Sequence, residues 1–284
     1  MSATVHLTEN GDGTVLSISD LTVRFAGAPA NVVDGVSFSV KRGKTLAIVG
    51  ESGCGKSVTS MGLMGLLPTT ARVDASDSLL IDEALLGMSE ERLLDVRGNR
   101  MAMIFQEPMT SLNPVFTIGE QIAESVMRHQ GLADKAARQR DVTIQAQILS
   151  LIANLQTETG TAMILITHDL GVVAEVADDV MVMYAGRVVE SGPVKTLFDD
   201  PQHPYTIGLM GSMPSIGPRE GRLATINGRV PTPAEMPGGC RFAGRCPFVI
   251  QQCRDERPPL LELSPGHFAA CIRAPLEQHV GVSA

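Results

Sequence analysis

Short apolar runs along the chain alternate with polar turns in a pattern typical of β-strands. The run TLAIV at 45–49 is apolar throughout and is followed by glycine, as expected of a strand buried on both faces of a sheet. Alternating or β-branched residues predict two earlier strands, at 15–25 and 36–40. The apolar runs at 101–105 and 162–167 predict two further buried strands.

Segments with helical character separate these strands. Residues 57–67 follow a glycine-rich loop and can continue as a helix, and residues 117–129 also have a helical pattern. In the segment 143–156, Ile and Leu recur at helical spacing and form one apolar face. Because strands alternate with helices, the sequence predicts an α/β protein with a largely parallel sheet.

The character of the chain changes near residue 210, where we expect a domain boundary. Residues 1–14 are a polar N-terminal tail, and residues 15–210 contain the predicted strands and helices. Residues 211–284 begin with segments rich in proline and glycine and then carry four cysteines. We therefore expect one larger domain followed by a small C-terminal extension.

A phosphate-binding loop is predicted where the strand at 45–49 ends. The sequence GESGCGKS fits the pattern G-x-x-x-x-G-K-[ST], in which curled backbone N–H groups and the following helix hold phosphate oxygens. Lys56 would contact the β- and γ-phosphates, Ser57 would bind Mg²⁺, and Cys54 is expected to be a tolerated small residue. The predicted nucleotide-binding residues of the loop are Gly50, Glu51, Ser52, Gly53, Cys54, Gly55, Lys56 and Ser57.

Composition and charge narrow the class of protein. The hydrophobic fraction of 44% is ample for a core, which rules out wholesale disorder. The net charge of −8, without a Lys/Arg run, argues against a nucleic-acid partner. No stretch approaches 18 consecutive apolar residues, and the polar N-terminus lacks the apolar region of a secretory signal. We therefore expect a protein of the reducing cytoplasm.

Three further segments resemble the ATP-binding subunits of ABC transporters, and more narrowly the dipeptide/oligopeptide/nickel importer branch. These segments are IFQEPMTSLNP at 104–114, LITHDLGVVAEVADDVMVMYAGRVVESG at 165–192 and DPQHPYT at 200–206. The resemblance runs from about residue 16 to residue 273. It implies a P-loop NTPase fold with an antiparallel β subdomain and a small cysteine-bearing C-terminal extension. ATP and Mg²⁺ are the implied cofactors.

The same resemblance assigns roles to three residues outside the loop. Gln106 matches the glutamine that senses Mg²⁺ and the membrane subunits, and it would join Ser57 as a Mg²⁺ ligand. His168 matches the histidine that contacts the γ-phosphate and orients the attacking water. Phe25 matches an aromatic residue that stacks on adenine. The structural alternatives are an ordinary loop glutamine, a structural histidine and a core phenylalanine.

Partners and location also follow from the resemblance. Such a subunit docks on two integral-membrane permease subunits at the cytoplasmic face of the inner membrane. It dimerises with a second ATP-binding subunit and is linked indirectly to a periplasmic or extracellular substrate-binding protein. The sequence does not specify the transported substrate, because specificity lies in the binding protein and the permease.

The chain departs from this family between Gln106 and His168. ABC ATPases need a signature loop of the LSGGQ type and a Walker B strand that ends in Asp-Glu, and neither occurs there. In relatives the segment DVTIQAQIL follows the Walker B strand at once, so the missing residues would have preceded Asp141. The run LLIDE at 79–83 superficially fits Walker B, but we interpret it as an edge strand whose Asp82–Glu83 turn is solvated.

The missing motifs have two expected consequences. Without the signature loop and the catalytic glutamate, neither composite ATP site of a dimer would be complete, and loss of a general base slows a reaction by about 10²–10⁴-fold. Without an internal strand, neighbouring ladder hydrogen bonds lose their partners unless another strand closes up. Residues 133–156 contain no Gly or Pro, so we hypothesise one long helix across the junction.

Four of the five cysteines lie close together in the C-terminal extension. The spacing C-x5-C-x6-C-x17-C of Cys240, Cys246, Cys253 and Cys271 differs from the paired C-x2-C of most structural zinc sites. Relatives in the importer branch share this arrangement, and some hold a [4Fe–4S] cluster there. Four thiolates suit an iron–sulfur cluster or zinc, and plain buried thiols remain an alternative. His267 is expected at the surface, or else as an outer ligand.

The resemblance therefore implies the ATP-binding subunit of a peptide-type ABC importer, and the missing motifs predict that it binds nucleotide but hydrolyses it poorly. One alternative is a non-catalytic subunit that binds nucleotide or permease and regulates intact subunits. Another is a truncated remnant without a stable fold. A generic P-loop kinase is disfavoured, because it would leave QEPMTSLNP, THDL and HPYT unexplained.

Overall fold

The computed structural model describes residues 13–81, 83–104, 156, 158–212 and 226–276. The chain folds into two units, which are described separately. The larger unit combines Met1–Leu86 with Thr159–Ala284, and the smaller unit is Gly87–Glu158. Several predicted features lie outside the described residues: the helices at 117–129 and 143–156, Gln106, Asp82, and the junction before Asp141.

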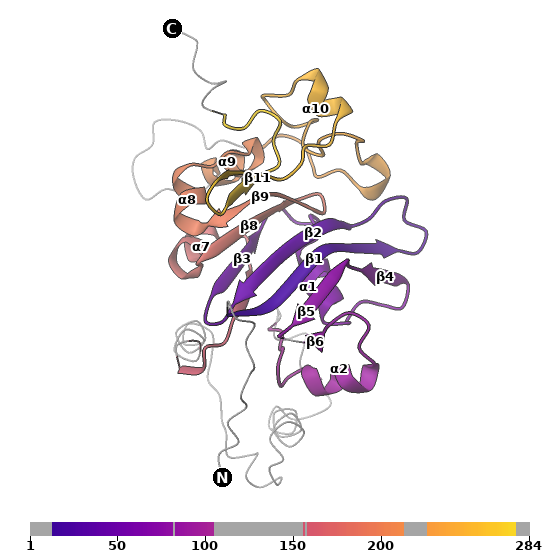
Figure 1. The fold of residues 1–284 in the computed structure, drawn as a ribbon. Coiled ribbons are helices and arrows are strands. Elements are labelled where there is room, and N and C mark those ends of the chain that lie inside the picture. Colours follow the sequence, from indigo (N-terminus) through magenta and orange to yellow (C-terminus); the bar gives the residue numbers. More distant parts are fainter. Residues whose placement is uncertain (1–12, 82, 105–155, 157, 213–225, 277–284) are drawn as a thin grey trace, which may run out of the picture. The chain divides into compact units, whose positions relative to one another are not determined.

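The larger unit contains two sheets (Figure 1), and the first is entirely antiparallel. In this sheet the long β1 pairs with β2 on one side and with both β4 and β5 on the other. Buried residues alternate along β1, as the sequence pattern predicted for 15–25. The strands are β1 (Thr14–Phe25), β2 (Val33–Lys41), β4 (Ala71–Asp74), β5 (Asp77–Leu80) and β6 (Glu83–Ala84).

The antiparallel sheet also accounts for the false Walker B run LLIDE. β5 pairs with β1 and turns directly into β6, with Leu80 opposite Glu83. The run thus belongs to the antiparallel sheet, as predicted. β5 is not an edge strand, because β6 pairs with its other side, and Glu83 is a half-buried residue of β6 rather than part of a solvated turn.

The second sheet is mixed and has the order β10-β11-β9-β8-β3-β7. β3 lies between β7 and β8 and runs parallel to both, and every residue of β3 is buried, as the sequence predicted. The strands are β3 (Thr45–Val49), β7 (Met163–Ile166), β8 (Asp179–Tyr184), β9 (Arg187–Pro193), β10 (Leu261–Ser264) and β11 (His267–Ala269).

Within the part of the chain that the structure describes, this sheet ends at β7. β7 pairs with β3, and no described strand pairs with its other edge. Its residues are half-buried rather than buried, unlike those of β3. This end of the sheet is what we expect if a neighbouring strand is missing, although residues 136–143, where we predicted a helix, lie outside the described residues.

The helix after the phosphate loop is shorter than predicted. α1 (Lys56–Leu63) ends because Gly65 adopts a positive φ of 62°. The Gly65 N–H bonds to the Gly62 carbonyl and the Leu66 N–H to the Met61 carbonyl, which is the hydrogen-bond pattern of a Schellman motif. The other helices among the described residues of this unit are α7 (Leu170–Val176), α8 (Val194–Asp199), α9 (Pro204–Gly211), α10 (Gln251–Asp255) and the 3₁₀ turn η1 (Pro233–Glu235).

In the smaller unit, the structure describes one helix, α2 (Glu90–Val96). Its N-cap residue, Ser89, accepts a hydrogen bond from the Arg92 N–H. The strand predicted at 101–105 is wrong over 101–104, where the structure shows a single bridge at Met101 and leaves Ile104 72% exposed. An apolar run forms a buried strand only where neighbouring strands pair with it, and the described residues provide none here.

The cysteine-bearing extension is part of the main core rather than a separate appendage. Its strand β11 pairs with β9, next to β10, and so lengthens the second sheet. Phe242 of the extension packs into the same buried cluster as Tyr184 of β8 and Tyr205 of α9, with ring centroids 5.1 and 5.4 Å away. The central sheet therefore supplies the core that the extension shares.

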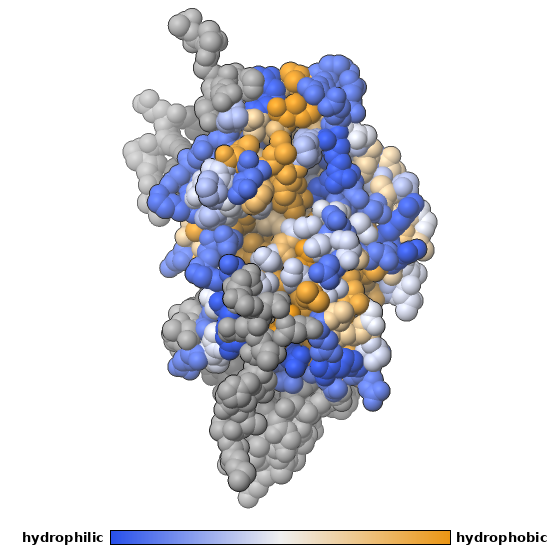
Figure 2. Space-filling model, in the orientation of Figure 1, coloured by the Kyte–Doolittle hydropathy of each residue, from blue (hydrophilic) through white to orange (hydrophobic). Residues whose placement is uncertain are grey.

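Some apolar side chains of the extension stay exposed, namely Ile250, Leu260 and Leu261. On the face drawn in Figure 2, hydrophobic residues, in orange, form a band that runs from the top of the molecule down through its middle. Among the described residues, the structure contains no helix long and apolar enough to cross a bilayer.

Candidate phosphate-binding site

The predicted phosphate loop leaves the carboxyl end of β3 and leads into α1. Gly50 has a φ of +146°, and a Cβ atom there would lie 2.2 Å from the Met183 carbonyl oxygen of β8. Only glycine fits this close approach of two backbones. The buried strand therefore fixes the first glycine of the loop, and α1 begins directly after the last one, Gly55.

Lys56 turns inward within the loop. Its Nζ donates hydrogen bonds to the Gly50 carbonyl at 2.7 Å and the Glu51 carbonyl at 2.9 Å. The Nζ also lies 3.6 Å from the Sγ atom of Cys54. Cys54 is fully buried, and burial raises the pKa of its thiol, so this residue is a neutral filler of the loop. The Lys56 ammonium is thus at the loop's centre, where a phosphate oxygen could replace the two carbonyls.

His168 follows β7, the strand next to β3, and lies at the same edge of the sheet as the phosphate loop. β7 and β3 are parallel, with Ile166 opposite Ile48, so the loop and His168 both lie beyond the carboxyl ends of neighbouring strands. This edge is where α/β sheets bind ligands. His168 is exposed, and the next residue, Asp169, caps α7 by accepting hydrogen bonds from the Gly171 and Val172 N–H groups.

Of the other two predicted site residues, the structure describes Phe25 but not Gln106. Phe25 is half-buried at the end of β1, where it pairs with Ala71 of β4. Gln106, predicted to sense Mg²⁺, lies outside the described residues. The roles of both residues remain predictions.

Sequence reasoning missed the residues that hold Glu51, the second residue of the loop. The Glu51 backbone N–H donates to the Tyr205 hydroxyl at 2.7 Å. Its carboxylate accepts two hydrogen bonds from the Arg245 guanidinium, at 2.6 and 2.9 Å. The signals were the tyrosine of HPYT and the arginine before Cys246, but sequence gives no means of pairing them with the loop.

A tight turn between β8 and β9 is hydrogen-bonded to the phosphate loop. Ala185 and Gly186 both have positive φ, as in a type I′ hairpin. The Gly186 N–H donates to the Cys54 carbonyl, and the Ala185 carbonyl accepts from Arg241 of the extension. This turn therefore joins the loop to the extension.

Asp34 adds an ion pair on the other side of the same turn. Its N–H donates to the Gly186 carbonyl, and its carboxylate accepts from both Arg187 and Arg241 at 2.6 Å. Burial acts to raise the pKa of Asp34, but the hydrogen bonds from Arg187 and Asn31 outweigh it and lower that pKa. Asp34 is therefore ionised at neutral pH and holds two arginines at the turn.

Glu190 anchors the start of α9 from inside the core. Its side chain is fully buried and accepts from the Gln202 N–H at 2.6 Å, the His203 N–H at 2.9 Å and His267 Nε2 at 2.8 Å. The expectation that His267 is a surface residue or an outer metal ligand is wrong, since it is 1% exposed and bound to Glu190. A single buried carboxylate thus positions the helix that carries Tyr205.

The Glu190–His267 pair predicts a pH-dependent contribution to stability. The hydrogen bond to Glu190 raises the pKa of His267 above its usual 6.5. The charged part of this stabilisation is then fully present below pH 6.5 and is lost as the pH rises through the folded-state pKa. We expect the loss of unfolding free energy in His267→Asn to be larger at about pH 6 than at about pH 9, measured by urea denaturation. Equal losses at both pH values would contradict the ion pair.

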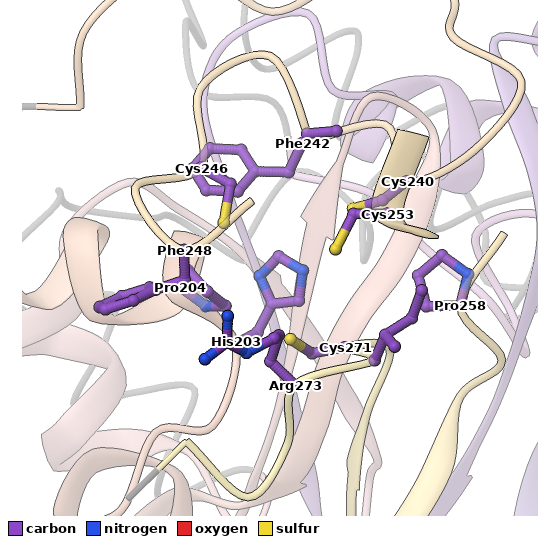
Figure 3. Close-up of a pocket in the computed structure, with 12 residues that line it drawn as sticks. His203, Pro204, Cys240, Phe242, Cys246, Phe248, Cys253, Pro258, Cys271 and Arg273 are labelled. Carbon is purple, nitrogen blue, oxygen red and sulfur yellow. The ribbon is translucent and has the colours of Figure 1, made fainter. Parts of the chain in front are cut away.

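The four cysteines of the extension line one pocket, shown in Figure 3. All four are free thiols, and burial raises the pKa of Cys240, Cys246 and Cys271, the last to about 11. His203 lies among them; burial lowers its pKa to about 4, and its neutral Nδ1 accepts from the Tyr205 N–H. No three His, Cys, Asp or Glu residues in the described chain are placed to hold a metal ion, so neither zinc nor the iron–sulfur cluster is supported by this arrangement.

Comparison with known proteins agrees with this geometry. Residues 33–166 match the ABC transporter family, and residues 189–253 match the oligopeptide/dipeptide transporter C-terminal region. The probable peptide ABC transporter ATP-binding protein y4tR of Sinorhizobium fredii is 42% identical over 92% of this chain and 95% of its own length. The oligopeptide transport ATP-binding protein AppD of Bacillus subtilis is 40% identical over 91% of this chain and 96% of its own length.

A solved structure supports the fold alone. The ATP-binding cassette MJ0796, in a post-hydrolysis state bound to ADP and phosphate, matches 63% of this chain and 98% of its own with a TM-score of 0.53 at 15% identity. The alignment to the Sinorhizobium protein runs over 318 residues, more than the 284 of this chain. It therefore includes positions at which this chain has no residue, as the missing motifs require. The chain belongs to the ABC transporter family, among the ATP-binding proteins of peptide ABC transporters.

Proposed function

We propose that the chain is the ATP-binding subunit of a peptide-type ABC importer and that it binds Mg·ATP at residues 50–57. The observation that carries the proposal is the GESGCGKS loop between buried β3 and α1, with Lys56 at its centre. Loop N–H groups and Lys56 would bind the phosphates, and Ser57 together with Gln106 would bind Mg²⁺. His168, at the same sheet edge, would contact the γ-phosphate, and Phe25 would stack on adenine.

The proposal extends to partners and place. The relatives named above are ATP-binding proteins of peptide transport, so we infer docking on two permease subunits and pairing with a second ATP-binding subunit. Such a complex would place the chain at the cytoplasmic face of the inner membrane. The substrate-binding protein would act on the other face of the membrane, without contacting this chain.

We infer that this chain retains ATP binding but is impaired in ATP hydrolysis. The sequence between Gln106 and His168 contains neither a signature loop nor a Walker B carboxylate, so the general base and part of the γ-phosphate binding site are missing. A second candidate, a non-catalytic subunit that regulates intact partners, is favoured by the same observation. Both candidates require nucleotide or permease binding, and ATP turnover in the complex separates them.

Removal of the loop's ammonium tests the site directly. We expect Lys56→Ala to weaken Mg·ATP binding by about ten- to hundredfold, because a charge-assisted hydrogen bond to phosphate is lost. Equilibrium titration with a fluorescent ATP analogue measures this change in the purified chain. Lys195→Ala is the control, because Lys195 is exposed on α8 and pairs with Asp199. Equal affinities of wild type and Lys56→Ala would contradict the proposed site.

The iron–sulfur cluster predicted from the resemblance remains a proposal. Its support is that four cysteines from separate segments line one pocket, and a [4Fe–4S] cluster binds four thiolates that are spread over its corners rather than around one ion. A bound cluster would staple the extension and would deprotonate thiols whose pKa burial now raises. Iron and acid-labile sulfide in anaerobically purified protein would support the cluster. Their absence would contradict it and would favour the alternative, that the four cysteines are plain buried thiols.

A further inference from the structure

The phosphate loop is held at its second residue by two side chains from the C-terminal half of the molecule. Tyr205 of α9 accepts the Glu51 N–H at 2.7 Å, and Arg245 of the extension binds both oxygens of the Glu51 carboxylate. The backbone and the side chain of Glu51 are therefore both fixed from outside the loop. Neither contact belongs to the phosphate-binding pattern itself.

Arg245 is held in place by contacts other than its ion pair with Glu51. Its side chain is 7% exposed, against 30% for Glu51. The guanidinium donates to the Asn227 and Ile226 carbonyls at 2.8 and 3.2 Å, and it lies 5.6 Å from the centre of the Tyr184 ring. Because these partners surround the guanidinium, Arg245 is the fixed member of the pair, and Glu51 is the member that it positions.

The sign of the charge on Glu51 makes this contact important for an anionic ligand. Glu51 lies between Gly50 and Ser52, inside the loop that would surround a triphosphate. An uncompensated carboxylate within about 10 Å of that ligand would repel it, and added salt would weaken this repulsion by screening it. The bidentate pair with Arg245 offsets the charge of the carboxylate.

We propose that Arg245 is a positioning residue of the phosphate loop, which neutralises Glu51 and thereby couples nucleotide affinity to the cysteine-bearing extension. The inference rests on the proposed function, because it requires that the loop binds nucleotide. Arg245 precedes Cys246, and Phe242 lines the pocket of the four cysteines while its ring lies 5.9 Å from the Arg245 guanidinium. A structural change in that pocket would thus alter the position of the loop through the Arg245 side chain.

A double-mutant cycle on Mg·ATP affinity tests the proposal in the full chain. We expect Arg245→Ala to weaken binding by about tenfold, because Glu51 is then unpaired beside the phosphates. Glu51→Gln is the single variant that completes the cycle, and adding Arg245→Ala to it should weaken binding by much less than tenfold, so the double variant should recover most of the loss. The weakening should be greatest at low salt. A purely structural role for Arg245 would not be rescued by Glu51→Gln.

Matched variants separate the possible outcomes. Arg229→Ala breaks an exposed ion pair with Glu235 in the same extension and should leave affinity unchanged. If Arg245→Ala does not fold, as judged by its melting transition, Arg245→Lys with and without Glu51→Gln makes the same comparison. Arg245 variants that bind like wild type, or that Glu51→Gln fails to rescue, overturn this inference alone. A wild-type chain that binds no nucleotide overturns the proposed function as well.

Discussion

Replacement of Glu190 by alanine should lower the free energy of unfolding by about 3–5 kcal/mol, the range expected when one partner of a buried ion pair is removed. Glu190 is fully buried, and its loss leaves the Gln202 and His203 N–H groups and the His267 ring without their acceptor. Urea denaturation followed by circular dichroism measures the change.

A matched control variant separates the loss of the buried Glu190 carboxylate from the effect of removing an exposed glutamate. Glu256 is exposed at the end of α10 and pairs only locally with Gln252, so Glu256→Ala should change the unfolding free energy by less than about 0.5 kcal/mol. Glu190→Gln, which keeps one carbonyl acceptor, should fall between the two. A Glu190→Ala variant as stable as the control would show that the buried carboxylate does not anchor α9.

Insertion of the missing segment should raise ATP turnover by about 10²–10⁴-fold, the contribution of a general base. The segment would come from the Sinorhizobium relative, placed at the junction before Asp141, so that a Walker B glutamate and a signature loop are restored. The measurement is phosphate release by the chain together with its partner ATP-binding subunit. The inserted chain carrying Lys56→Ala is the control, because turnover that survives without Lys56 does not come from this site.

The opposite result is also clear. Turnover by the unmodified chain that equals that of the repaired chain, and that depends on Lys56, would mean that another carboxylate replaces the missing glutamate. Glu83 would not be a candidate, since it lies in β6 of the antiparallel sheet rather than at the carboxyl edge of β3.

The elements that could be predicted from sequence are those whose pattern is local. The buried run at 45–49 became β3 with the predicted bounds, and the loop after it has glycine where two backbones meet. The strand at 162–167 appeared as β7 because β3 was available as its partner. The equally apolar run at 101–104 did not form a strand, because pairing depends on neighbours that a local pattern does not describe.

The contacts that hold the site could not be predicted, because they join residues far apart in the chain. Glu51 and Arg245 are separated by 194 positions, and Glu190 and His267 by 77. Glutamate is usually exposed and histidine is intermediate in burial, so a fully buried pair of the two gives no signal in a single sequence. The cysteine spacing identified an unusual segment, but only the structure shows that its arginines reach the phosphate loop and the β8–β9 turn.

The measurement that tests the central claim most directly is nucleotide bound and phosphate released in one sample of the chain assembled with its partner ATP-binding subunit and permease. We predict that Mg·ATP labels this chain in a Lys56-dependent manner, while phosphate release does not exceed that of the Lys56→Ala complex. Labelling that is independent of Lys56, or phosphate release that Lys56→Ala abolishes, would contradict an ATP-binding subunit impaired in hydrolysis.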